Sequence, residues 1–114
     1  MRNQRLTESA LGAKVETVLE TPPPDGMALG PNGKLYLTDV EHGAINVFDP
    51  QTKKLTSVIS DGRLSWPDSL AWGPQGTLYV TCSQIQNMPR FNGGKNMHST
   101  TYQLFKVVGA LATP

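Results

Sequence analysis

The sequence predicts an all-β fold that consists of about two four-stranded antiparallel blades of a β-propeller, preceded by a short helical segment. Two observations predict it. A sequence repeat with a period of 43 residues runs through the 114-residue chain, and periods of about 40–50 residues with short strands are typical of propeller blades. The chain also has 11 glycines, 9 prolines and 38% hydrophobic residues, a composition that favours a turn-rich β protein.

The repeat aligns without gaps. Residues 24–38 (PDGMALGPNGKLYLT) match residues 67–81 (PDSLAWGPQGTLYVT), and the proline, aspartate, alanine, both turn glycines and the Leu-Tyr pair recur. Each copy has two apolar runs separated by a Gly-Pro-x-Gly turn, which is the pattern of a β-hairpin. We therefore expect strands at Met27–Leu29, Lys34–Asp39, Ala44–Phe48 and Leu55–Ile59 in the first unit, and at Ser69–Trp72, Thr77–Cys82 and Tyr102–Val108 in the second.

The segment before the first unit predicts two further elements. Thr7–Ala13 is compatible with one or two helical turns capped by Thr7 or Ser9. Lys14–Leu19 alternates well enough to be a strand, which would be the last strand of a preceding blade. The expected organisation is a lead-in at 1–23, a complete blade at 24–61 and an incomplete blade at 62–114.

This amount of propeller would leave apolar blade faces uncovered. Two arrangements would cover them. Either the missing blades belong to a longer natural chain, or copies of this chain associate with themselves. Three copies would supply six blades, and closed symmetric assembly is the usual solution for homo-oligomers.

Charge and motifs exclude several classes of function. The net charge is +1 without a basic cluster, so neither nucleic acid nor an anionic membrane is expected as a partner. Cys82 is the sole cysteine and is expected to be a buried thiol. The sequence has no P-loop or dinucleotide motif, and we expect no cofactor. No signal peptide or transmembrane run is present in this chain, and the compartment is not indicated.

Several motifs resemble the major royal jelly/yellow protein family, particularly its bacterial members. Residues 25–28 (DGMA) and 39–45 (DVEHGAI) are similar to that family's penultimate blade, while 66–71 (WPDSLA), 90–95 (RFNGGK) and 102–107 (YQLFKV) are similar to its last blade. The resemblance implies a six-bladed propeller of which this chain holds the C-terminal two blades, and relatives that include secreted proteins. Functions in that family include binding of biogenic amines.

Candidate site residues gather on one face of the predicted blades, because antiparallel strands send alternate turns to opposite faces. The loops before the first strand and after the second strand of each blade share this face, and ligand sites favour loops on a rigid scaffold. The candidate ligand-binding residues are Asp25, Asp39, His42, Asp68, Ser83, Gln84, Arg90, Phe91 and Asn92.

The carboxylates on this face allow two interpretations each. Asp25 and Asp68 occupy equivalent repeat positions and either ring the channel mouth, where they would hold a cation or an amine, or cap their own turns. Asp39 and His42 form either an acid/base pair or part of a solvated loop. In both cases the second interpretation is favoured, and no metal site is expected.

The long loop at 83–101 is the strongest candidate for binding, because connections of this length are often lids or binding loops. Arg90, Phe91 and Asn92 supply a cation, an aromatic face and an amide, which suit a small polar aromatic or anionic ligand. The alternative is that this loop packs over the end of the propeller.

The function expected from the resemblance is non-enzymatic binding of a small molecule, an amine or a polar aromatic compound. The alternative is a metal-dependent lactonase or isomerase, as in related six-bladed propellers. A third interpretation is a fragment without independent activity. The residues assign no catalytic group, and whether the protein is an enzyme stays open at this point.

Overall fold

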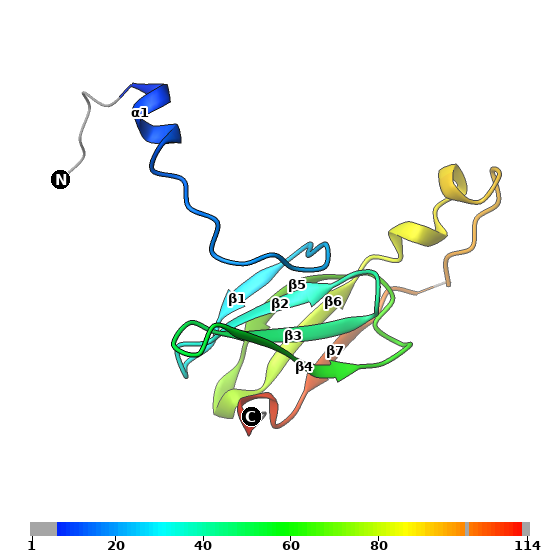
Figure 1. Ribbon diagram of the computed structural model, residues 1–114. Helices are drawn as coiled ribbons and strands as arrows, with labels where there is room; N and C mark the ends of the chain where they lie inside the picture. The colour runs from blue at the N-terminus through cyan, green and yellow to red at the C-terminus, as the bar shows by residue number, and fades with distance from the viewer. Residues whose placement is uncertain (1–6, 100, 113–114) are drawn as a thin grey trace.

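Two antiparallel β-sheets packed face to face form the centre of the molecule, as the computed structural model shows for residues 7–99 and 101–112 (Figure 1). The first sheet has four strands in the order β1-β2-β3-β4, and the second has three in the order β5-β6-β7. This arrangement confirms the predicted fold of one complete and one incomplete propeller blade. The strands are β1 (Met27–Leu29), β2 (Leu35–Asp39), β3 (Ala44–Asp49), β4 (Lys54–Ser60), β5 (Pro67–Trp72), β6 (Leu78–Cys82) and β7 (Leu104–Val107).

A short helix precedes the sheets, as predicted. Helix α1 (Glu8–Gly12) begins after Thr7, whose side-chain oxygen accepts a hydrogen bond from the backbone N–H of Ala10 at 3.1 Å. This contact satisfies one of the free N–H groups at the helix start. Helix α1 and the chain after it extend away from the sheets (Figure 1).

The strand predicted at Lys14–Leu19 does not form, and this expectation was wrong for a single chain. The segment has no regular secondary structure, and the side chains of Val15 and Val18 are 81% and 72% exposed. The physical reason is that a strand needs a neighbour for its backbone hydrogen bonds, and no described strand lies beside this segment.

The two repeat copies fold alike. Met27 pairs with Leu37 in the first sheet, and its counterpart Leu70 pairs with Val80 in the second. The hairpin turns also correspond, because Gly30 N–H donates to Lys34 O and Gly73 N–H donates to Thr77 O, both at 2.8 Å. The gapless alignment therefore reflects a common blade structure.

The core lies between the two sheets. Tyr36, Ile45 and Val47 of the first sheet pack against Leu78 and Val80 of the second, and all five are buried. We call the side of the first sheet that carries Tyr36 its front face, and the side of the second sheet that carries Leu78 its back face. Tyr36 meets Trp72 edge-on, with ring centroids 4.8 Å apart and planes at 82°, a favourable aromatic geometry.

Cys82 belongs to this core, as the sequence predicted. Burial raises the pKa of its thiol, and the nearby negative charge of Asp68 raises it further. A thiol held in its neutral form is a poor nucleophile.

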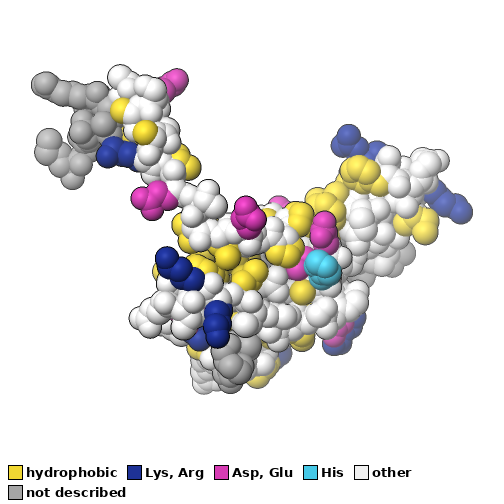
Figure 2. Space-filling view, viewed as in Figure 1, with side chains coloured by type: hydrophobic (Ala, Val, Ile, Leu, Met, Phe, Trp, Pro, Cys, Tyr) yellow, Lys and Arg dark blue, Asp and Glu magenta, His cyan; other side chains and the backbone are white. Residues whose placement is uncertain are grey.

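The back face of the first sheet is exposed along its first strand, β1, whereas Leu37 and Phe48 on the same face are buried. Met27 and Leu29 are 65% and 67% exposed on it, and hydrophobic side chains are visible over this side of the molecule (Figure 2). Within the described residues, no helix has the length and apolar character needed to cross a membrane.

Candidate functional site

Asp25 lies directly before the first strand of the complete blade. Its backbone N–H and that of Gly26 both donate to the hydroxyl of Thr38 at 2.9 Å, which fixes the turn into β1. The indole N–H of Trp66 donates to Asp25 Oδ2 at 2.8 Å. Asp25 is exposed, and within the described residues no hydrogen bond to its Oδ1 is present. One carboxylate oxygen is thus held while the other is free to meet a ligand.

Asp68, the repeat counterpart of Asp25, has different surroundings. It is half-buried, and its Oδ1 accepts a hydrogen bond from the hydroxyl of Thr81. The predicted capping of each turn by its own aspartate was wrong. A threonine hydroxyl accepts from the backbone N–H groups in the first blade, and the aspartates accept from Trp66 and Thr81 side chains instead.

The starts of the two blades touch each other. A Cβ atom added to Gly26 would lie 2.3 Å from the backbone oxygen of Asp68, which is far inside van der Waals contact. Together with the hydrogen bond between Trp66 and Asp25, this contact fixes the start of the second blade relative to the start of the first. The interblade packing therefore places the exposed Asp25 carboxylate.

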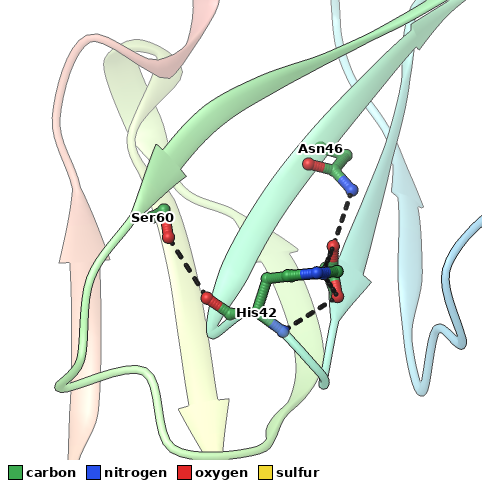
Figure 3. A network of polar contacts seen from close by, with 4 residues as sticks. His42, Asn46 and Ser60 are labelled. Carbon is green, nitrogen blue, oxygen red and sulfur yellow. Dashed lines mark hydrogen bonds and ion pairs between the residues drawn. The ribbon is translucent and has the colours of Figure 1, made fainter.

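A second polar group is built around Asp39 in the turn between β2 and β3 (Figure 3). The imidazole Nδ1 of His42 lies 2.9 Å and 2.8 Å from the two Asp39 carboxylate oxygens. The backbone N–H of His42 also donates to Asp39, at 3.1 Å, and the side-chain amide of Asn46 donates at 3.3 Å. The hydroxyl of Ser60 donates to the carbonyl of His42 at 3.1 Å.

This arrangement makes His42 an oriented base. Asp39 is buried, whereas the His42 side chain is 62% exposed. In a neutral ring, the Nδ1 that faces two carboxylate oxygens carries the proton, which leaves the lone pair of Nε2 directed away from Asp39. The predicted solvated loop is thus only half correct, since the imidazole is solvated but its carboxylate partner is not.

The long loop is organised by Gln84, which is buried despite its polar side chain. Its Nε2 donates to the hydroxyl of Ser99 at 2.8 Å, and its Oε1 accepts from Ser99 N–H at 3.0 Å. Its carbonyl lies 2.9 Å from Nε2 of His98, whose Nδ1 lies 2.9 Å from the hydroxyl of Tyr102. These bonds close the two ends of the loop on each other, while its middle projects beyond the sheets (Figure 1).

The remaining loop candidates are largely occupied by local contacts. The guanidinium of Arg90 lies 5.3 Å from the ring centre of Phe91, so the aromatic face already has a cation. The Asn92 amide donates to the carbonyls of Gln86 and Met88 at 2.9 Å. Ser83 carries a buried hydroxyl without a hydrogen-bond partner in the described part of the chain.

The predicted site residues thus form separate groups rather than one cluster. Asp25 and Asp68 each lie at the start of a blade, Asp39 and His42 pair in their turn, and Gln84 holds the long loop. Sequence reasoning missed the side chains that position them. Thr38 and Thr81 recur in the repeat and were detectable, whereas the contacts of Trp66, Asn46 and Ser60 depend on how blades and strands pack.

The described residues contain no cluster of acidic, histidine or cysteine side chains of the kind that holds a metal ion. Within residues 7–99 and 101–112, no three His, Cys, Asp or Glu side chains lie close enough together to hold one. Calcium and similar hard cations need six to eight oxygen ligands. Asp25 fits the role of a single such ligand, and any others would have to come from outside this set.

The fold and the exposed carboxylate at the blade starts define a β-propeller protein with a candidate site on its loop face. Comparison with known families gives the particular one. Residues 3–84 match the model of the SMP-30/gluconolactonase/LRE-like region. Since the match covers more than half of the sequence, the chain belongs to this family. The resemblance to major royal jelly/yellow proteins was therefore wrong. A search of curated proteins found no match.

Proposed function

We propose that this chain supplies part of the active site of a lactonase-type propeller, with Asp25 as its main contribution. The expectation of a non-enzymatic binder loses its basis, because it rested on the resemblance that the family match overturns. The family match supports the alternative instead, since gluconolactonase is among the activities for which this family is named. The substrate class would be sugar lactones.

The observation that carries the proposal is the state of the Asp25 carboxylate. It is exposed before the first strand, the strand that borders the central channel in a propeller, and Trp66 fixes one of its oxygens at 2.8 Å. The other oxygen is available to accept a proton from water or to bind a cation that polarises the lactone. In the hydrolysis, a water oxygen bonds to the lactone carbonyl carbon, the ring C–O bond breaks, and the product acid releases one proton at neutral pH.

The release of this proton allows a direct test. Hydrolysis of glucono-1,5-lactone and a panel of other aldonolactones would be followed by pH-stat titration, with and without added Ca²⁺, Mn²⁺ or Zn²⁺. We expect Asp25→Asn to abolish the rate above the uncatalysed background. The matched control is Asp68→Asn, whose amide oxygen still accepts from Thr81 and which we expect to keep most of the activity.

A second candidate for the proton acceptor is His42. Its imidazole is exposed and is oriented by the buried Asp39, as a general base requires. Loss of activity in His42→Gln together with full activity in Asp25→Asn would assign the base to His42. Absence of lactone hydrolysis by the wild-type chain under all metal conditions would contradict the lactonase proposal.

A further inference from the structure

The second sheet lacks the strand that completes the first. The first sheet has β4 beside β3, whereas β7, which takes the place of β3 in the second sheet, is an edge strand among the described residues. An open strand edge presents unpaired backbone N–H and C=O groups to any segment that can pair with them. Among the described residues, the edge of β7 is therefore open to one more strand.

The lead-in segment has the sequence of such a strand. Residues 14–19 (KVETVL) match β4 residues 54–59 (KLTSVI) without gaps: a lysine, an aliphatic residue, two polar residues, a valine and an aliphatic residue. In β4 this pattern pairs along β3. In the lead-in it pairs with no other described strand, and its two valines are among the most exposed hydrophobic side chains of the described residues.

The exposed side chains of β1 on the back face of the first sheet indicate what should pack there. Met27 and Leu29 correspond in the repeat to Leu70 and Trp72. Leu70 and Trp72 pack against the core that includes Tyr36 on the front face of the first sheet. The front face of the second sheet carries Tyr79, the counterpart of Tyr36. A second copy of this chain can therefore cover Met27 and Leu29 with the same geometry that joins the two blades within one chain.

The register of the missing strand follows from the first blade. Val47 pairs with Tyr36, and Lys106 pairs with Tyr79, so Lys106 takes the place of Val47. Since Thr56 lies opposite Val47 and Glu16 takes the place of Thr56, Glu16 should lie opposite Lys106. The same register puts Val15 opposite Val107 and Leu19 opposite Leu104.

These pairings are complementary in charge and polarity. An acidic residue directly opposite a lysine is a favourable cross-strand pair. Leu104 is 65% exposed in the single chain, and Leu19 would cover it as Ile59 covers Ile45 in the first blade.

We propose that residues 14–19 of one copy pair with β7 of a second copy and complete its three-stranded sheet. Residues 14–19 precede β1, so a strand that they form would complete the blade that packs on the back face of the first sheet. The chain's own β7 lies in the second sheet, which packs on the front face of the first sheet. With this pairing, the described strands and the lead-in strand amount to two whole blades per copy. The contact is head-to-tail, so it repeats until a ring closes, and three copies close a ring of six blades.

The test measures the solution mass of the full 114-residue chain by light scattering, together with charge reversals across the new pair. We expect a trimer for the wild type, at least a tenfold weaker association for Glu16→Lys and for Lys106→Glu, and recovery in the double variant. Glu20→Lys, which makes the same charge change outside the segment, is the matched control and should remain trimeric.

A cross-linking experiment separates pairing between copies from pairing within one copy. The Val15→Cys/Val107→Cys variant, in which Cys82 stays buried, should form disulfides that join chains into a covalent trimer under oxidation. A monomeric or polydisperse wild type overturns the proposal, as does a trimer that neither responds to the charge reversals nor cross-links between chains.

Discussion

Trp66 donates its indole N–H to the carboxylate of Asp25 across 41 residues of sequence, at 2.8 Å, and joins the start of the second blade to the start of the first. Trp66 holds this position with a backbone φ of 57°, which is rare for a bulky residue. The local strain indicates that blade packing, rather than the preference of the turn itself, determines where Trp66 points.

Replacement of Trp66 by Phe should therefore weaken the contact between blades. The ring is kept and the donor is lost, so we expect a loss of about 1 kcal/mol in the free energy of unfolding. Asp25→Asn should cost less, because an amide oxygen still accepts the bond. Urea unfolding of both variants, with a double-mutant cycle using Asp25→Ala, isolates the pair. A coupling energy near zero would contradict the role assigned to this bond.

Gly26 offers a sharper test of the same junction. Any side chain here would meet the backbone oxygen of Asp68, which is 2.3 Å from the ideal Cβ position. We expect Gly26→Ala to destabilise the fold by about 1–3 kcal/mol, the usual range for overpacking. Gly62→Ala is the control, since no atom lies within 4 Å of its Cβ position. Equal midpoints of thermal unfolding for the two variants would disprove the close approach.

The sequence predicts those parts of the fold that depend on local pattern. The repeat places Met27–Leu29 and the hairpins correctly, because alternation and turn residues act within a few positions. Residues 14–19 show the limit of this reasoning. Their pattern is that of a strand, but a strand also needs a neighbour, and within one chain the described structure provides none.

The candidate site shows the same division. Asp39 and His42 are three residues apart in one turn, so their proximity was predictable from the sequence. The hydrogen bond from Asn46 to Asp39 was not, because Asn46 lies in the next strand and approaches Asp39 only when β2 and β3 pair. The partner of Asp25 was equally hidden, since Trp66 approaches only after two blades have packed together.

The tautomer of His42 is a direct consequence of its contact with Asp39. In the wild type the ring should carry its proton on Nδ1, which faces both carboxylate oxygens. Asp39→Asn replaces one of these oxygens by an amide donor, and the population should shift towards the Nε2–H form. Nitrogen NMR shifts of the imidazole report the tautomer at a pH where the ring is neutral. Glu41→Gln is the control and should leave the wild-type tautomer unchanged. An Nε2–H ring in the wild type would contradict the arrangement.

The pair formed by Asp61 and Arg63 predicts a pH dependence at the edge of the first sheet. Arg63 donates Nη2–H to Asp61 Oδ2 at 2.7 Å and Nε–H to Oδ1 at 3.0 Å. These hydrogen bonds lower the pKa of Asp61 from 3.8 to about 2. Because the folded pKa lies below the unfolded one, the stabilisation is present above pH 3.8 and is lost as the pH falls towards 2.

Carboxyl carbon NMR titration of Asp61 measures this shift directly. The wild type should titrate with a midpoint of about 2. Arg63→Gln should raise the midpoint towards 3.8 without reaching it, because the backbone N–H of residue 63 still donates to Asp61 Oδ1. Arg63→Lys keeps the charge but loses the paired geometry of the guanidinium, so its midpoint should lie between those of the wild type and Arg63→Gln. Added salt should raise the wild-type midpoint only slightly, since short-range hydrogen bonds rather than long-range charge cause most of the shift. A wild-type midpoint near 3.8 would show that the pair does not persist in solution.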